Sequence, residues 1–256
     1  MKIDVAREGG IQTIRFNRPE KKNAITTAMY EALTQALEGG DWSEGVRAHV
    51  IAGLPGAFSA GNDMNDFLAF ADNGALGEPV LRFLRTIATL QKPVIAAVDG
   101  LAVGIGTTLL LHCDLVYASP EASFHTPFLD LGLVPEAASS LLMPRRMGYA
   151  RAFEMLCLGI KYDAGRALAA GLVNEIIPGE ELESYVRQVA LQLASKPPEA
   201  LAAGRKLLRG SPENVMARIE EEAVLFAERL SSSEAREAFR SFLEKRPADF
   251  ASSGAE

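Results

Sequence analysis

The sequence feature that most restricts the fold is residues 94–98, an uncharged run of valine, isoleucine and alanine. A strand without a polar face has to be covered on both sides, which is typical of parallel sheets packed between helices. The glycine-rich residues 100–106 follow almost directly and lead into a helix predicted over residues 107–112. A buried strand, a glycine loop and a helix in this order predict a mixed α/β fold.

The first part of the chain adds further short strands to this picture. Strands predicted over residues 3–6 and 11–16 are separated by a pair of glycines, which indicates a hairpin. His49 begins another strand after a polar turn, so we expect its side chain at the surface. Residues 66–79 are rich in Gly, Asn and Asp and predict an irregular, mobile segment.

The end of the chain has a different character, because every segment from Glu180 onward has helical periodicity. The change falls near residues 195–198, where two prolines interrupt the pattern. We therefore expect a catalytic core over residues 1–195 and a C-terminal helical region over residues 196–256. Four helices are predicted after residue 180, over residues 182–193, 198–208, 212–230 and 234–245.

The composition restricts what the protein binds. A formal net charge of -7 disfavours non-specific nucleic-acid binding, which needs a basic surface. Cys113 and Cys157 lie in apolar helical contexts without a CxxC motif, so we expect reduced thiols and a cytoplasmic protein. The chain opens with strand-like alternation instead of a signal peptide, and no apolar run approaches the length of a membrane span. No spacing of His, Asp and Glu indicates a metal site.

Glu136 is the candidate catalytic residue, because it is a carboxylate within the largely apolar residues 124–140. Pro135 before it and the small residues after it predict a turn entering a helix, with the proline at the first helical position. An acid at this place has a simple structural explanation, since it complements the positive end of the helix dipole. Nearby, His125 is expected to support the loop, and Asp130 is expected at the surface.

Two loops offer backbone N–H groups that could bind a negatively charged oxygen. Residues 58–64 connect a strand to a helical start, and residues 100–108 connect a buried strand to a helix. Each loop alone is equally typical of a tight turn chosen for packing. The second lacks the third glycine of GxGxxG and the Gly-Lys-Ser/Thr of a P-loop. If the two loops converge, they form an oxyanion hole.

These segments resemble one known family, the crotonase (enoyl-CoA hydratase/isomerase) superfamily. The resemblance rests on FSAGNDM, KPVIAAVDGLAVGIGTTLLLHCDLVYAS and FHTPF…GLVPEAASSLLMPRRMG, with NRPEKKNAIT and AFRSFLEKR fitting near the two ends. It covers essentially the whole chain in order. It implies a spiral core of ββα units, a C-terminal helical region that drives assembly into a homotrimer or hexamer, and an acyl-CoA substrate. CoA is then part of the substrate, and no separate cofactor is implied.

The resemblance also implies roles for individual residues. The backbone N–H groups of Asn62 and Ile105 are expected to form the oxyanion hole; many relatives have glycine in place of Ile105, but a backbone donor survives that change. Asp63 is grouped with the CoA site, and we expect its role there to be structural. The other residues expected around CoA, the last two in contact with a neighbouring subunit's CoA, are Lys22, Ala24, Ala60, Phe242 and Lys245.

Within the superfamily, the sequence resembles isomerases more than hydratases. A hydratase uses two glutamates, and this chain has Thr108 and Phe128 at those positions, neither of which can act as a general base for water. The pattern FHTPF…PEAASS is similar to peroxisomal-type Δ3,Δ2-enoyl-CoA isomerases, which use one glutamate at the position of Glu136. The implied reaction moves a proton from C2 of a 3-enoyl-CoA to C4 of the dienolate, in fatty-acid β-oxidation.

Other readings stay open on the sequence. One is another crotonase-type reaction on an acyl-CoA thioester, such as hydration, hydrolysis or isomerisation of a ring product. A second is an inactive CoA-binding protein that kept the fold, which the two retained loops and the well-placed acid disfavour. An RNA-binding relative exists, but the acidic charge disfavours that function. The acyl-chain length cannot be read from the sequence.

Overall fold

The strands form two sheets in the computed structural model, which describes residues 2–73, 76–244 and 246–250. The larger sheet has the order β1-β2-β3-β5-β7-β10 and the smaller one β4-β6-β8-β9. The strands of the larger sheet are β1 (Ile3–Glu8), β2 (Ile11–Phe16), β3 (Ala48–Ala52), β5 (Val94–Val98), β7 (Leu115–Ala118) and β10 (Glu175–Ile176). Those of the smaller sheet are β4 (Ala57–Ser59), β6 (Leu101–Val103), β8 (Ser123–His125) and β9 (Tyr162–Asp163).

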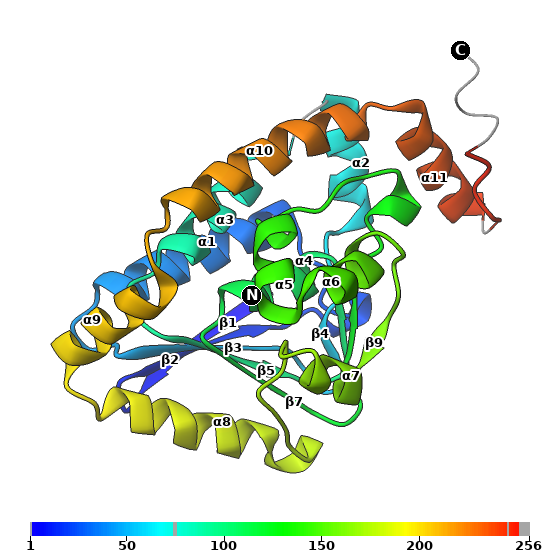
Figure 1. Ribbon diagram of the computed structural model, residues 1–256. Helices are drawn as coiled ribbons and strands as arrows, with labels where there is room; N and C mark the ends of the chain where they lie inside the picture. The colour runs from blue at the N-terminus through cyan, green and yellow to red at the C-terminus, as the bar shows by residue number, and fades with distance from the viewer. Residues whose placement is uncertain (1, 74–75, 245, 251–256) are drawn as a thin grey trace.

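Helices surround the sheets (Figure 1). The α-helices are α1 (Thr27–Trp42), α2 (Met64–Asn73), α3 (Glu78–Thr89), α4 (Ile105–Thr108), α5 (Ser139–Met147), α6 (Tyr149–Leu156), α7 (Ala164–Ala169), α8 (Gly179–Ala194), α9 (Pro198–Arg209), α10 (Glu213–Leu230) and α11 (Ser233–Glu244). Three short 3₁₀ helices complete the elements: η1 (Pro19–Lys21), η2 (Leu109–His112) and η3 (Leu129–Leu131). In the described part of the chain, no helix combines the length and hydrophobicity needed to cross a membrane.

The strand β5 is covered on both faces, as its uncharged sequence predicts. All five of its residues are buried, and it pairs in parallel with β3 on one side and β7 on the other. Ile95 and Ala97 pack with α8, whereas Val94, Ala96 and Val98 belong to the main core on the opposite face. The predicted α/β class is therefore confirmed.

From β3 to β8, consecutive strands alternate between the two sheets, and this repetition is the predicted ββα spiral. The chain goes from β3 to β4, from β5 to β6 and from β7 to β8, each time passing from the larger sheet to the smaller one. The strands β4, β6 and β8 are parallel neighbours. Because the carboxyl ends of parallel strands meet at one edge, the loops that follow these three strands lie close together.

The C-terminal helix α10 packs across the core and carries α11 with it. Phe226 of α10 meets Phe67 of α2 edge to face, and Phe67 also meets Phe239 of α11. Arg85 of α3 and Glu220 of α10 form an ion pair. In Figure 1, α10 runs above α3 and α5 along one side of the molecule.

Two sequence predictions about the first half of the chain are wrong. Residues 66–73 and 78–79 are helical: Phe67 and Phe70 lie one turn apart and are buried, and Gly77 is the N-cap of α3, with Pro79 in its first turn. His49 is fully buried instead of exposed, because β3 lies inside the sheet. Its Nδ1 is 3.3 Å from Nε2 of Gln12, and its Nε2 is 3.8 Å from a carboxylate oxygen of Asp41.

Candidate active site

Glu136 lies in a loop over residues 132–138, called here the Glu136 loop, between η3 and α5. The residue is only 5% exposed, and the Thr108 hydroxyl donates a hydrogen bond to Oε1 of its carboxylate. Burial raises the pKa of Glu136 to about 8; the Thr108 hydrogen bond lowers the pKa, and the charge of Glu222 raises it further. A carboxyl group of this kind can take up and release a proton near neutral pH.

The predicted helix start around Pro135 is wrong, because α5 begins at Ser139. Ala137 and Ala138 have φ of 59° and 54°, left-handed values that a helix cannot continue through. The first N–H groups of α5 are capped from another helix: the Glu222 carboxylate accepts the N–H groups of Ala138 at 2.6 Å and Ser140 at 3.0 Å. Glu136 is thus not the acid that caps the helix, which removes the simple structural explanation for it.

The two glycine loops are in contact with each other. A Cβ on Gly61, whose φ is 87°, would lie 2.8 Å from the Val103 carbonyl oxygen. A Cβ on Gly106 would lie 2.8 Å from the carbonyl oxygen of Ser59. Glycine is therefore needed at both places for the loop after β4 to approach the loop after β6. The backbone hydrogen bonds among the described residues include no acceptor for the N–H of Asn62 or of Ile105.

Tyr30 of α1 joins this region, although nothing in the sequence pattern marked it. Its hydroxyl donates to Oδ1 of Asn62 at 2.5 Å, which fixes the Asn62 side chain. Burial raises the pKa of Tyr30, and the carboxylates of Glu136 and Asp66 raise it further. Tyr30 therefore joins α1 to the loop that carries Asn62.

Four of the residues expected around CoA lie together in the structure, connected by hydrogen bonds. The Ala60 N–H donates to the Lys22 carbonyl oxygen at 2.9 Å, and Arg18 bridges the Ala24 carbonyl oxygen at 2.9 Å and the Asp63 carboxylate at 2.6 Å. The structure thus brings these four positions together. Lys22 is exposed, and Ala24 and Ala60 are half-buried.

Asp63 has the contacts of a structural residue. Its Oδ1 accepts the Asn65 N–H at 3.0 Å at the start of α2, and its Oδ2 binds Arg18. Burial alone would raise the pKa of Asp63, but the hydrogen bonds from Arg18 and from backbone N–H groups, together with the charge of Arg18, outweigh burial and lower the pKa. Of the last two residues expected near CoA, Phe242 belongs to α11 but its side chain is not described, and Lys245 lies outside the described residues.

The positions that hold glutamate in hydratases are buried here. Thr108 is fully buried and contacts Glu136, and Phe128 is buried in the main hydrophobic core. Phe124 and Leu133 belong to the same core, with Leu131 packed against it. Glu136 itself is almost fully buried, and this burial is the main cause of its raised pKa.

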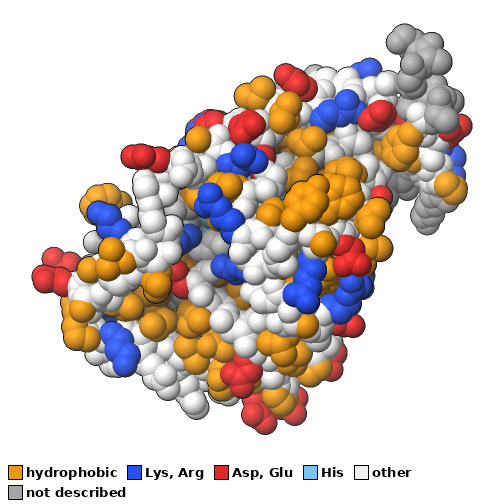
Figure 2. All heavy atoms as spheres, viewed as in Figure 1, with side chains coloured by type: hydrophobic (Ala, Val, Ile, Leu, Met, Phe, Trp, Pro, Cys, Tyr) orange, Lys and Arg blue, Asp and Glu red, His pale blue; other side chains and the backbone are white. Residues whose placement is uncertain are grey.

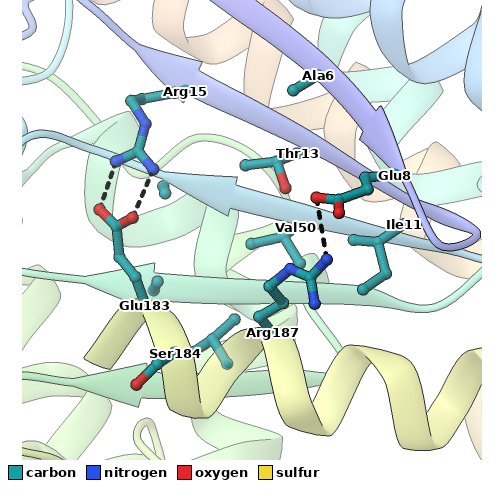
Figure 3. A pocket seen from close by; sticks show the side chains of 12 residues that line it. Ala6, Glu8, Ile11, Thr13, Arg15, Val50, Glu183, Ser184 and Arg187 are labelled. Carbon is teal, nitrogen blue, oxygen red and sulfur yellow. Dashed lines mark hydrogen bonds and ion pairs between the residues drawn. The ribbon is translucent and has the colours of Figure 1, made fainter. Parts of the chain in front are cut away.

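A separate hollow lies on the α8 face of the larger sheet (Figure 3). It has a volume of about 210 Å³ and lies between β1, β2, β3, β5 and α8. Two ion pairs span it, Arg15 with Glu183 at 2.7 Å and Arg187 with Glu8 at 2.9 Å. Its charged groups are already paired, so it offers no free acid or base. Among the described residues, no group of three or more His, Cys, Asp or Glu side chains could hold a metal ion.

The comparisons with known proteins agree with this fold. Residues 6–253 match the model of the enoyl-CoA hydratase/isomerase family, so the chain belongs to this family. The chain is similar to a solved structure described as enoyl-CoA hydratase/isomerase from Pseudoalteromonas atlantica T6c, with a TM-score of 0.93 and 39% identity over 98% of this chain and 100% of that one. The predicted superfamily and its fold are confirmed.

The similar curated proteins include both isomerases and a hydratase. Enoyl-CoA delta isomerase 2 of Rattus norvegicus is 41% identical over 96% of this chain, which spans 64% of that protein. Enoyl-CoA delta isomerase 3, peroxisomal, of Mus musculus is 36% identical over 94% of this chain and 78% of that protein. A probable enoyl-CoA hydratase of Rhodobacter capsulatus is 37% identical over 94% of both chains. These relatives carry the names of both reactions, so the residues of the site distinguish between them.

Proposed function

We propose that the protein is a Δ3,Δ2-enoyl-CoA isomerase, which converts 3-enoyl-CoA into 2-trans-enoyl-CoA in fatty-acid β-oxidation. The observation that carries this proposal is Glu136, a buried acid whose pKa is raised to about 8 and whose carboxylate, among the described residues, is hydrogen-bonded only by Thr108, the residue that stands in place of a hydratase acid. The other buried carboxylate nearby, Glu222, has both oxygens occupied by donors from residues 138–140. The similarity to two enoyl-CoA delta isomerases supports the same reaction.

In the first step, the Glu136 carboxylate removes a proton from C2 of the substrate. This proton is acidic because the thioester carbonyl and the C3–C4 double bond both stabilise the resulting carbanion. The electron pair of the C2–H bond moves toward the thioester, and the negative charge develops on its oxygen. The product of this step is a dienolate and a neutral Glu136 carboxyl group.

The negative oxygen of the dienolate is held by the N–H groups of Asn62 and Ile105. Such preorganised donors matter as much as the base, since removing one typically costs about two to three orders of magnitude in rate. The contact of Gly61 with Val103, and of Gly106 with Ser59, supports this role because it brings the two loops together.

In the second step, the protonated Glu136 gives its proton to C4. The electron pairs return, the carbonyl forms again, and the double bond lies between C2 and C3. No water, metal or redox partner enters the balance. A pKa near the working pH suits a group that must first accept and then donate the same proton.

Hydration is disfavoured because neither position that holds a hydratase glutamate has a residue that can activate water. Thr108 does not ionise usefully, and its hydroxyl is engaged with Glu136. Phe128 has no proton to exchange and is buried in the core. Glu136 is then the one proposed base, and it removes a proton from carbon C2 of the substrate instead of from water.

The assembly and location follow as further parts of the proposal. We propose a homotrimer or hexamer, because α9 and α10 expose Leu207 and Leu208 at 85% and 90% and Val224 at 60%. Figure 2 shows hydrophobic side chains along these two helices. Phe242 and Lys245 are then candidates for contact with a neighbour's CoA. A cytoplasmic location is supported by Cys113 and Cys157, which are both free thiols.

The Glu136→Gln variant tests the proposed base directly. Glutamine keeps the size and the hydrogen bond from Thr108 but cannot take a proton, so kcat on 3-enoyl-CoA should fall by about two to four orders of magnitude. Asp130→Asn is the matched control, because Asp130 is an exposed acid six positions earlier in the same region and should leave kcat unchanged. Turnover by Glu136→Gln within tenfold of wild type contradicts the proposed function.

A further inference from the structure

We infer that Glu222, on the C-terminal helix α10, is a positioning residue that holds the Glu136 loop in the conformation in which Glu136 faces the site. The inference rests on the proposed function, since it assigns Glu222 an effect on the reaction that acts through Glu136. Glu222 does not touch the substrate in this account. It acts on the two residues that follow the base.

Glu222 accepts three hydrogen bonds from the residues that follow Glu136. It is 4% exposed, although it lies on a helix whose other glutamates are mostly at the surface. One carboxylate oxygen accepts the Ala138 N–H at 2.6 Å. The other accepts the Ser140 N–H at 3.0 Å and the Ser140 hydroxyl at 2.5 Å. Arg218, one turn earlier on α10, donates to that hydroxyl oxygen at 3.0 Å.

The segment that Glu222 holds has a backbone that residues with a Cβ rarely adopt. Ala137 and Ala138 both have left-handed φ angles, and neither is glycine. Two such residues in succession persist only where the surroundings hold them in place. They follow Glu136 directly, so relaxation of this turn would change the direction of the Glu136 side chain.

A second buried side chain also binds this turn. His112, at the end of η2, has its Nε2 2.8 Å from the Ala137 carbonyl oxygen. Burial lowers the pKa of His112 to about 4, so its ring is neutral at physiological pH and Nε2 carries the donated hydrogen. His112 thus fixes the carbonyl of the turn, and Glu222 fixes its N–H groups.

Glu222 also influences the charge state of the base. Glu136 interacts with Thr108 of α4 through a hydrogen bond and with Tyr30 of α1 and Glu222 of α10 through their charges. The negative charge of Glu222 raises the pKa of Glu136, as a smaller effect than burial. Burial raises the pKa of Glu222 itself, while its hydrogen bonds from Ser140 and Ala138 and the charge of Arg218 lower it. A neutral residue at position 222 should therefore lower the pKa of Glu136.

The experiment compares Glu222→Gln with Glu221→Gln in the full-length protein. Glu221 is the matched control, because it is the neighbouring residue on α10, its side chain is 61% exposed, and it pairs with Arg218. Steady-state kinetics on 3-enoyl-CoA are measured for both variants over a range of pH. A glutamine amide cannot accept all three donors that the carboxylate accepts, so the turn loses part of its restraint.

For Glu222→Gln we expect kcat to fall by about tenfold to a hundredfold, with KM changed less than about threefold. The acid limb of its kcat/KM profile should move to lower pH, which loss of folded protein alone would not produce. Glu221→Gln should match wild type. A kcat for Glu222→Gln within twofold of wild type and an unmoved acid limb overturn the inference.

A milder variant keeps the test decisive if Glu222→Gln does not fold. Ser140→Ala removes the hydroxyl that donates to Glu222 but leaves both backbone hydrogen bonds in place, so we expect a loss in kcat of about two- to fivefold. Wild-type kcat in Ser140→Ala then overturns the inference. Failure of the proposed function is recognised separately, by turnover in Glu136→Gln. An inactive Glu136→Gln together with a normal Glu222→Gln refutes the positioning role alone.

Discussion

Replacing Glu136 with glutamine should make the protein more stable at alkaline pH, although it abolishes activity. In the folded protein the pKa of Glu136 is raised to about 8 from an ordinary value of 4.5, mainly by burial. The folded state therefore binds the proton more tightly than the unfolded state. Below pH 4.5 both states are protonated and the buried carboxyl has no ionisation cost.

The sign and size of the effect follow from this difference. As pH rises from 4.5 to 8 the unfolded state ionises first, so the free energy of unfolding falls, and above pH 8 the loss is complete. At about 1.4 kcal/mol for each pKa unit, the gap between 4.5 and about 8 corresponds to about 5 kcal/mol. Glutamine does not ionise, so Glu136→Gln avoids this loss. For a chain of this size, the gain at pH 9 amounts to at least about 10 °C in Tm.

Thermal unfolding of wild type and Glu136→Gln at pH 5 and pH 9, at one protein concentration, measures the effect. At pH 5 the two proteins should have similar Tm, since wild type has lost little of the stability in question. At pH 9 the variant should unfold well above wild type. Asp130→Asn is the control, because Asp130 is exposed and its replacement should not produce this pH dependence. An equal difference in Tm at both pH values refutes a buried, proton-retaining Glu136.

Three other predictions follow from the site and the assembly. Thr108→Val removes the hydrogen bond that lowers the pKa of Glu136, so the acid limb of kcat/KM should move to higher pH; an unmoved limb contradicts the contact. Gly61→Ala should cost stability and at least about tenfold in kcat, because its Cβ would lie 2.8 Å from the Val103 carbonyl oxygen at a φ of 87°; a fully active, stable variant argues against the packing of the two loops. Analytical ultracentrifugation should show a trimer or hexamer at micromolar concentration, and a monomer would contradict the role given to α9 and α10.

The central strands and the two glycine loops could be predicted because their signals are local. The uncharged residues of β5 require cover on both faces, and the glycines after β4 and β6 mark close backbone approaches. The prediction of an irregular segment over residues 66–79 is wrong because it gave more weight to the Gly, Asn and Asp content than to Phe67 and Phe70, two apolar residues at helical spacing. The prediction of an exposed His49 is wrong because burial of a polar side chain depends on partners such as Gln12 and Asp41, which a strand pattern does not show.

The parts of the site that escaped the sequence depend on contacts between distant segments. Glu222 accepts a hydrogen bond from the N–H of Ala138, which is 84 residues away in the sequence. Because its helix is rich in glutamate, the sequence alone does not distinguish Glu222 from the solvent-exposed glutamates around it. Tyr30 binds Asn62 across 32 positions and looks like an ordinary core residue of α1. The start of α5 was placed too early because its cap is supplied by Glu222 and not by a residue next to Pro135.

The most direct test of the proposed reaction is product analysis with 3-enoyl-CoA and 2-trans-enoyl-CoA incubated separately with the wild-type protein. We expect the first substrate to yield 2-trans-enoyl-CoA of unchanged mass, and the second to gain no water beyond the enzyme-free control. Rapid formation of 3-hydroxyacyl-CoA from 2-trans-enoyl-CoA, with 3-enoyl-CoA left unchanged, would contradict the isomerase and favour a hydratase.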